Sequence, residues 1–221
     1  MRRPLVIVGA GEFAQIACEY FTHDSDYDVV AFSVEREYLT QGTLAERPVV
    51  AYETLQAQYP AQDYELYVAI PATHLNRLRT RLYRDAKSKG YRFASYVSSR
   101  AFVWHNAQIG ENSFIFEGNV IQPFAKVGNN CILWSGNHVG HRTVVHDNVF
   151  IASHAVISGY CDIGEGCFIG VNTTFNDQLR VAPDNVIGAG AVVTRDTEPG
   201  RIYVGSPAHA VPDKSSFAVR L

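Results

Sequence analysis

An unbroken six-residue repeat constrains the fold of this chain more than any other feature of its sequence. Steps of six from Val103 to Val193 meet an apolar residue sixteen times in succession, and Phe175 is the only aromatic among them. Chance does not produce such a series when about a third of positions are of this type. The sixteen positions are Val103, Ile109, Ile115, Ile121, Val127, Leu133, Val139, Val145, Ile151, Ile157, Ile163, Ile169, Phe175, Val181, Ile187 and Val193.

A second column of mostly small residues lies two positions before each of these, from Ala101 to Ala191. One bulky and one small inward position in every six residues fit neither a 3.6-residue helix nor a flat strand alternation. They fit short strands joined at tight corners, with three strands, and therefore 18 residues, in each coil. Successive coils then pair as parallel strands about 4.8 Å apart, and the sixteen steps make about five coils of a triangular prism.

The residues before the repeat are predicted to form a small α/β unit. Strands are predicted over 4–8, 29–32, 65–69 and 92–96, with helices from the first glycine turn to about His23 and over about 74–89. The turn Gly9-x-Gly11-x-x-Ala14 follows the first strand and would let a phosphate approach the N-terminus of a helix. Dinucleotide folds use two mononucleotide halves and this unit has one, so a single-nucleotide phosphate site is favoured over an NAD site. A purely structural turn is the alternative.

Composition excludes several classes of function. The net charge of −3 gives no support to a nucleic-acid partner. The first apolar run ends at Gly9, too early for a signal peptide or a membrane span, so we expect a cytoplasmic protein without a membrane partner. The four cysteines (Cys18, Cys131, Cys161 and Cys167) form no CxxC pair, which indicates neither a metal site nor a disulfide framework. The last three belong to the small column and are predicted to be buried thiols.

Three phrases carry a resemblance to a known family: Ile163-Gly164-Glu165-Gly166 and the stretch over 186–193 within the repeat, and the closing Val204-Gly205-Ser206-Pro207-Ala208 after it. The segment from about 100 to 210 resembles the hexapeptide-repeat transferases, whose β-helix is left-handed. The periodicity itself does not set the handedness, and a solenoid with only a structural role is the alternative.

With the small α/β unit in front, nearly the whole chain is similar to a family of bacterial sugar acyltransferases. That family includes sialic acid O-acetyltransferases and N-acetyltransferases of nucleotide-linked 4-amino-4,6-dideoxy sugars. The expected fold is an α/β, Rossmann-like N-terminal subdomain followed by a left-handed parallel β-helix of hexapeptide repeats. The expected domains are a nucleotide-sugar-binding domain over 1–97, the acyltransferase β-helix over 98–195 and a C-terminal tail over 196–221.

The resemblance implies a catalytic base. In the family, the catalytic histidine precedes by 18 residues a glycine whose N–H meets the thioester carbonyl, and here His141 precedes Gly159 by that interval. One full coil separates them, so they are expected to stack on one corner about 5 Å apart. Imidazole is the usual base near neutral pH. Relatives often carry an acidic residue after this histidine to orient it, whereas this chain has Arg142. Asn137 is a candidate for the orienting group, and a structural asparagine ladder over Asn119 is the alternative.

The resemblance also implies binding residues. The nucleotide of the sugar substrate would contact strand ends of the first domain, at Gly9, Gly11, Ser33 and Glu35, although relatives with a histidine at position 13 differ from Phe13 here. Further substrate contacts are expected from Asn137, His138 and His154. Acetyl-CoA, the acyl donor, would lie between neighbouring prisms of a homotrimer whose active sites are between subunits. Its predicted contacts are Gly159, Ile169, Gly170, Ile187, Gly188, Ala189 and Arg195.

Three functions are compatible with this pattern. The first is an acetyl-CoA-dependent N-acetyltransferase acting on the C4 amine of a nucleotide-linked 4-amino-4,6-dideoxy sugar, for cell-surface polysaccharides such as O-antigen. An amine needs only one modest base, which suits a single histidine. The second is an O-acetyltransferase of sialic acid or a related sugar, whose harder hydroxyl favours an acidic partner for the base. The third is a sugar-nucleotide-binding scaffold without catalysis.

Overall fold

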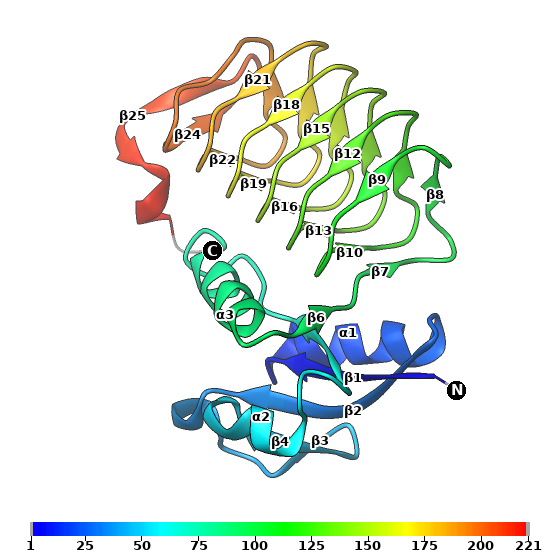
Figure 1. Ribbon diagram of the computed structural model, residues 1–221. Helices are drawn as coiled ribbons and strands as arrows, with labels where there is room; N and C mark the ends of the chain where they lie inside the picture. Colours follow the sequence, from blue (N-terminus) through cyan, green and yellow to red (C-terminus); the bar gives the residue numbers. More distant parts are fainter. Residues whose placement is uncertain (1, 220–221) are drawn as a thin grey trace. The chain divides into compact units, whose positions relative to one another are not determined.

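The computed structural model describes residues 2–219, and the chain divides into two compact units. The first comprises residues up to 71 and 78–96, and the second comprises 72–77 and 97 onwards. Figure 1 shows the α/β elements of the first unit and the stacked coils of the second. Among the described residues, no helix is both long and apolar enough to cross a bilayer.

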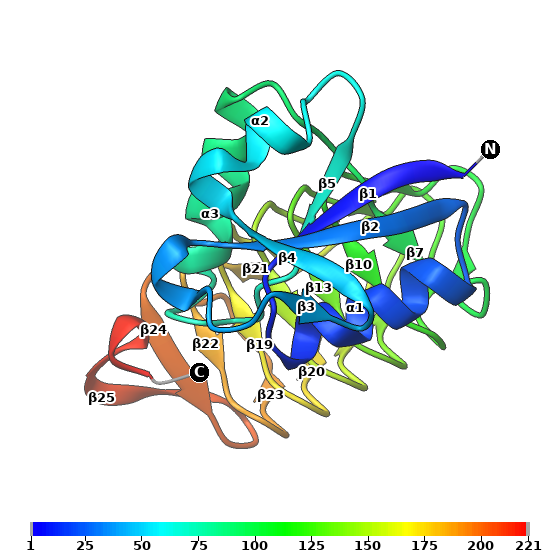
Figure 2. The ribbon, with the colours of Figure 1, turned by 90° about the horizontal axis from the view of Figure 1, so that it is seen from below.

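The first unit is built on a six-stranded sheet with the order β3-β4-β2-β1-β5-β6. All neighbours pair in parallel except β3 with β4. Figure 2 shows β1, β2 and β4 side by side. The strands are β1 (Arg3–Val8), β2 (Tyr27–Val34), β3 (Thr43–Leu44), β4 (Arg47–Ala51), β5 (Glu65–Val68) and β6 (Arg92–Phe93), and the helices are α1 (Glu12–His23), α2 (Leu55–Gln58) and α3 (Arg77–Ser88).

The strands β1 and β5 are buried almost throughout, as expected of parallel strands covered on both faces. The predicted strands and first helix are found within a few residues of their expected bounds, whereas β3, β4 and α2 were not predicted.

Helix α3 begins three residues later than predicted. His74, Leu75 and Asn76 all have left-handed backbone (φ 50, 50 and 63°), which cannot be part of a right-handed helix. The Asn76 amide donates hydrogen bonds to the carbonyls of Gly166 and Cys167, both at 3.2 Å, and this anchors the turn to a coil of the second unit, to which 72–77 belongs.

The second unit is a three-faced prism of two-residue parallel strands. Most strands pair with the strand 18 residues later, for example Phe114 with Ile132 and Val120 with His138. Face 1 has the order β7-β10-β13-β16-β19-β22-β24-β25, face 2 β8-β11-β14-β17-β20-β23 and face 3 β9-β12-β15-β18-β21. The strands of faces 2 and 3 and most of face 1 are β7 (Tyr96–Val97), β8 (Phe102–Val103), β9 (Gln108–Ile109), β10 (Phe114–Ile115), β11 (Val120–Ile121), β12 (Lys126–Val127), β13 (Ile132–Leu133), β14 (His138–Val139), β15 (Val144–Val145), β16 (Phe150–Ile151), β17 (Val156–Ile157), β18 (Asp162–Ile163), β19 (Phe168–Ile169), β20 (Thr174–Phe175), β21 (Arg180–Val181), β22 (Val186–Ile187) and β23 (Val192–Val193).

The predicted apolar column forms the axis of the prism. Fourteen of its sixteen residues are buried in one cluster, and Val103 and Ile109 pack against it at the first coil. Cys131, Cys161 and Cys167 of the small column are buried in the same cluster. All three thiols are therefore buried, as predicted, and burial raises the pKa of Cys161 and raises that of Cys167 to about 12.

The segment after the repeat closes the prism. Strand β24 (Arg201–Val204) adds to face 1 with Ile202 beside Val186, and β25 (His209–Ser215) pairs antiparallel with β24. Much of the predicted tail is therefore sheet.

Candidate active site

One edge of the prism, where the chain passes from face 2 to face 3, carries the predicted base. We call residues 122–124, 140–142, 158–160 and 176–178 the His141 edge. Within it His141 lies directly on Gly159. A Cβ added to Gly159 would lie 2.5 Å from Cε1 of His141 and 2.9 Å from each ring nitrogen. The imidazole therefore occupies the space that any other residue at 159 would fill.

The His141 ring is held by few contacts. Its main-chain N–H donates to Oε1 of Gln122 at 3.0 Å. Its ring meets the Tyr160 ring edge to face, with centroids 5.0 Å apart and an interplanar angle of 83°. Within residues 2–219 neither ring nitrogen has a hydrogen-bond partner, and the side chain is exposed. Both nitrogens can therefore meet a substrate.

Arg142 does not orient the base. Its guanidinium lies 4.4 Å from the centroid of the Phe124 ring, as a cation–π pair on the outside of the edge.

The Gly159 N–H, which the resemblance assigns to the thioester carbonyl, already has a partner. It donates to Oδ1 of Asp177, one coil further on, at 2.8 Å. Asn129 donates its N–H to Oδ1 of Asp147 in the same way at another edge, also at 2.8 Å. While Asp177 accepts this N–H, the donor is not available to a second acceptor.

Asn137 does not fit its predicted role at the active site. The side chain is 1 % exposed, its amide donates to the carbonyl of Trp134 and its Oδ1 accepts from the N–H of Ala155 at 2.7 Å. Both polar atoms bind the backbone of the coils, as in the alternative of a structural ladder. The expectation that Asn137 orients His141 or contacts substrate is corrected accordingly.

The other predicted histidines lie away from the His141 edge. His138 is half-buried on the outside of face 2, between Val120 and Val156. His154 lies on the edge where face 1 passes to face 2, which we call the His154 edge (residues 135–137, 153–155, 171–173 and 189–191). A Cβ on Gly136 would lie 2.6 Å from the His154 ring. Face 2 separates this histidine from His141 within one chain.

The predicted acetyl-CoA contacts also divide between these two edges. Arg195 follows Gly159 and Asp177 at 18-residue steps and is exposed, and Gly170, Gly188 and Ala189 lead into the His154 edge. The side chains of Ile169 and Ile187 are fully buried in the prism core and cannot contact a ligand, so only the main chain of these two residues could lie along acetyl-CoA. The N–H groups of Gly170 and Gly188 are bonded to the next coil, to the carbonyls of Ile187 and Tyr203.

A separate pocket of about 300 Å³ lies in the first unit, at the carboxyl ends of β1 and β2. All four predicted nucleotide contacts line it. Gly9 (φ 126°) must be glycine there, because a Cβ would lie 2.8 Å from the carbonyl oxygen of Ala69. The Ser33 hydroxyl is fully buried without a hydrogen-bond partner among the described residues, and a buried hydroxyl of this kind is normally satisfied by a water or a ligand. The complete lining is Val8, Gly9, Ala10, Gly11, Ser33, Val34, Glu35, Tyr38, Thr40, Gln41, Val49, Ile70, Leu78 and Leu82.

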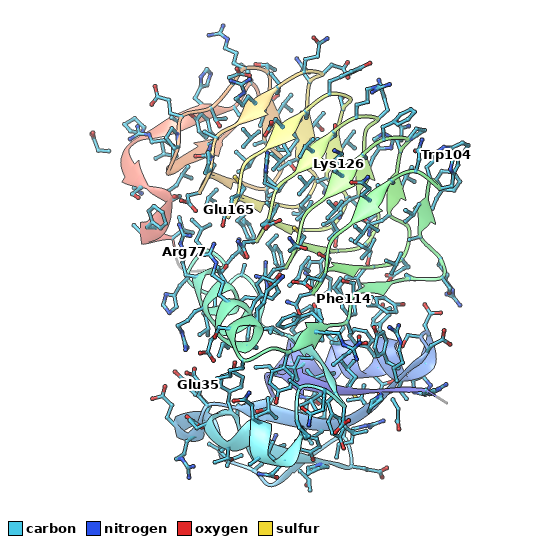
Figure 3. The ribbon with its side chains drawn as sticks, in the orientation of Figure 1. Glu35, Arg77, Trp104, Phe114, Lys126 and Glu165 are labelled. Carbon is cyan, nitrogen blue, oxygen red and sulfur yellow. The ribbon has the colours of Figure 1, made fainter. Side chains whose placement is uncertain are left out.

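Glu35, labelled in Figure 3, is fixed in this pocket by a residue that the sequence did not indicate. Arg81 of α3 donates to its two carboxylate oxygens at 2.9 and 2.7 Å. These hydrogen bonds raise the pKa of Arg81, so its guanidinium stays protonated. Glu35 therefore presents an oriented carboxylate whose remaining lone pairs can accept from a ligand.

Part of the prism matches a family of repeat-containing transferases. Residues 106–141 and 124–159 match the family model for the bacterial transferase hexapeptide (six repeats). With the parallel faces, this match fits a left-handed β-helix preceded by an α/β region. No curated protein matches the chain in sequence.

Solved structures show which acetyltransferases the chain resembles. The chain is 25% identical to a mutant of perosamine N-acetyltransferase from Caulobacter crescentus in complex with CoA and GDP-perosamine, with TM-score 0.85 and coverage of 95% of this chain and 97% of that one. It is also 25% identical to the acetyltransferase domain of PglB from Neisseria gonorrhoeae in complex with acetyl coenzyme A, with TM-score 0.84 and coverage of 96% and 100%. The predicted resemblance to the hexapeptide-repeat sugar acyltransferases is confirmed.

Proposed function

We propose that this protein is an acetyl-CoA-dependent N-acetyltransferase that acts on the C4 amine of a nucleotide-linked 4-amino-4,6-dideoxy sugar. The observation that carries the proposal is the exposed imidazole of His141 seated on Gly159, with both ring nitrogens open to a substrate. In the reaction the sugar amine attacks the thioester carbonyl, the C–N bond forms and the C–S bond breaks. His141 accepts the amine proton and CoA leaves as the thiol once protonated. The likeness to the perosamine and PglB enzymes supports this chemistry.

We propose a Rossmann-like nucleotide site in the first unit. The parallel strands have the order β4-β2-β1-β5-β6, and the order reverses direction beside β1. Ligands of such sheets bind at the carboxyl ends of the strands at this point, where the pocket with Ser33 and Glu35 lies. A single nucleotide with its sugar is the proposed occupant, and polysaccharide synthesis in the cytoplasm is the proposed setting.

We further propose a homotrimer with active sites between subunits. The predicted contacts lie on the His141 edge and on the His154 edge, which face 2 separates within one chain. Residues on opposite sides of one face can share a ligand when the face of one subunit packs beside a second copy. The groove formed in this way would hold acetyl-CoA along Gly159 and Arg195 of one copy and Gly170, Gly188 and Ala189 of the next.

The direct test is an assay of acetyl transfer from acetyl-CoA to GDP-, dTDP- and UDP-linked 4-amino-4,6-dideoxy sugars. We expect an amide product with one of these acceptors and a loss of kcat of about 10²- to 10⁴-fold in His141→Asn. Near-normal turnover in His141→Asn would refute the assigned base. An ester product on sialic acid, with no amide product, would replace the proposal by the O-acetyltransferase.

Nucleotide binding is tested separately by thermal shift with the same sugar nucleotides. We expect one of them to raise the Tm of the wild-type protein, and Ser33→Ala to weaken that binding about tenfold. Without ligand, Ser33→Ala should be at least as stable as wild type, because the buried hydroxyl it removes has no partner. No stabilisation by any of the three nucleotides would refute the site.

A further inference from the structure

The corners of the prism share one backbone requirement. Fourteen consecutive corners each place one residue in the left-handed region, with φ between 52 and 77°. Glycine adopts this conformation freely, and asparagine, aspartate and histidine adopt it more readily than other residues. The fourteen are Asn112, Gly118, Phe124, Asn130, Gly136, Arg142, Asn148, His154, Tyr160, Gly166, Asn172, Gln178, Asp184 and Gly190.

The His141 edge departs from this requirement at every coil. The ten left-handed residues of the other two edges are all glycine, asparagine, aspartate or histidine. The four on the His141 edge are Phe124, Arg142, Tyr160 and Gln178. Residues held in a costly backbone conformation cluster at functional sites, where the side chain is required for another reason.

Tyr160 shows what such a reason can be. Its side chain does not stabilise the core, because the residue is 53 % exposed. Its hydroxyl has no hydrogen-bond partner among residues 2–219. The contact that it does make is with the His141 ring, at 5.0 Å between centroids and 83° between planes.

His141 needs a group of this kind. The torsion that turns an imidazole about its Cβ–Cγ bond has broad, shallow minima, so a ring without hydrogen bonds is poorly oriented. Gly159 supplies a floor under the ring and Gln122 fixes the backbone, but neither prevents rotation. Among the described residues no carboxylate bonds to the ring. Among the described residues, the Tyr160 ring is the remaining contact that can limit rotation of the His141 ring.

We propose that Tyr160 is a positioning residue for the base. Its ring holds the His141 imidazole against Gly159 in the orientation that receives the amine proton, in place of a hydrogen-bonded carboxylate. The kinetic test of this inference rests on the proposed acetyl transfer. A second test, by NMR, does not depend on turnover.

The test uses two substitutions with opposite expectations. Tyr160→Asn removes the ring and places a residue that tolerates the left-handed backbone, so we expect a Tm equal to or above that of wild type. Its kcat should fall at least about tenfold, with KM for both substrates within about twofold. Tyr160→Phe keeps the ring and should keep kcat within about twofold. The control is Glu46→Asn, the same kind of backbone change at φ 61° in the exposed turn between β3 and β4 of the first unit, for which kcat should be unchanged.

Unchanged kcat in Tyr160→Asn would overturn the proposal, and so would an equal loss in Tyr160→Phe, since the hydroxyl rather than the ring would then be responsible. NMR of ¹³C-histidine-labelled protein follows the ring without turnover. We expect an NOE from the His141 Cε1 proton to the Gly159 α-protons in wild type and Tyr160→Phe, weakened in Tyr160→Asn. If wild type transfers no acetyl group but this pattern holds, the proposed function fails and the positioning role stands. If the NOE is equal in all three proteins, the positioning role fails.

Discussion

At the scale of single residues, the candidate site depends on Gly159 having no side chain. The three atoms nearest to a Cβ on Gly159 all belong to the His141 ring, and the backbone at 159 is not in the left-handed region. Glycine is therefore needed there for space and not for conformation. This separates the position from Gly136, where the backbone has φ 77° and a Cβ would also meet a histidine ring.

Gly159→Ala should consequently act through His141. The new methyl group would displace the imidazole, and we expect kcat to fall about 10²-fold, because small misplacements of a catalytic group have effects of that size. Steady-state kinetics would show this, and Tm should change by only a few degrees. The matched control is the same substitution in a His141→Ala background, where the ring is gone and the added methyl should leave Tm unchanged. A Tm loss of equal size in both backgrounds would mean that the methyl meets the backbone instead.

Asp177 gives a second prediction at this scale. Its carboxylate accepts the Gly159 N–H at 2.8 Å and competes with an acyl oxygen for that donor. Asp177→Ala should release the N–H and lower KM for acetyl-CoA about threefold or more, without change in KM for the sugar nucleotide. Asp147→Ala removes the equivalent cap from Asn129 at another edge and should leave both KM values unchanged. A rise in KM for acetyl-CoA in Asp177→Ala would instead show that the carboxylate supports the acyl donor.

At the scale of the element, the six-residue coil determines which way each side chain points, and this much could be read from the sequence. The apolar and small columns predicted the prism, its 18-residue stacking and the meeting of His141 with Gly159, because two inward positions in every six fix the direction of all the rest. The same columns already contained Ile169, Ile187 and Asn137. Their inward burial was therefore predictable, and the binding roles taken from resemblance conflicted with it.

Other parts of the site had no such periodic signal. The pair of Arg81 with Glu35 joins residues 46 apart in an α/β unit without a repeat, and the left-handed turn over 74–76 follows from one amide that bonds to a distant coil. The Tyr160 contact could be predicted from the sequence only in part. The position before each small residue is rich in asparagine and glycine, so the departure at the His141 edge is visible in the sequence, but the ring contact is not.

The buried cysteines test the stability of the coils. Cys131, Cys161 and Cys167 lie in three coils of the core, and burial raises the pKa of Cys167 to about 12. At pH 8 that thiol stays protonated, and the thiolate is the form that reacts. We expect none of the three to react with a disulfide reagent over minutes in the native protein and all to react in denaturant. Mass spectrometry identifies the labelled sites, and fast native labelling of any one would show that its coil opens locally.

At the scale of the whole molecule, the outer surfaces of the prism differ in a way that bears on assembly. The outward positions of face 3 are mostly polar or charged, and Figure 3 labels Lys126 on this face. They are Gln108, Lys126, Val144, Asp162 and Arg180. Those of face 2 are mostly apolar: Phe102, Val120, His138, Val156, Thr174 and Val192. Phe102 is 53 % and Val156 41 % exposed in the single chain. A mostly apolar face of this kind supports the proposed association, and it lies between the two edges that share the predicted contacts.

Val156→Glu should therefore separate the proposed trimer. A charge in the middle of face 2 would be buried without a partner on assembly, so we expect a monomer by sedimentation, loss of acetyl transfer and an unchanged far-UV CD spectrum. Val144→Glu places the same charge on face 3, at an outward position of β15, and should remain assembled and active. A fully active Val156→Glu monomer would show that one chain completes the site alone.

Shared sites make a further, stricter prediction possible, because each site would take His141 from one subunit and the His154 edge from the next. Ala189→Glu, which would place a charged side chain at an exposed position of that second edge, and His141→Ala should each be nearly inactive as pure trimers. When the two variants are unfolded together and refolded as mixed trimers, some sites receive an intact His141 edge from one chain and an intact His154 edge from the other. With random mixing of equal amounts, we expect activity to return to roughly a quarter of wild type, since half of the edges of each kind are intact.

Native mass spectrometry would show whether mixed trimers have formed. If they have formed and activity does not return, both edges of each site belong to one chain. The Val156→Glu variant in place of either partner should abolish the recovery, because it would not enter the trimer.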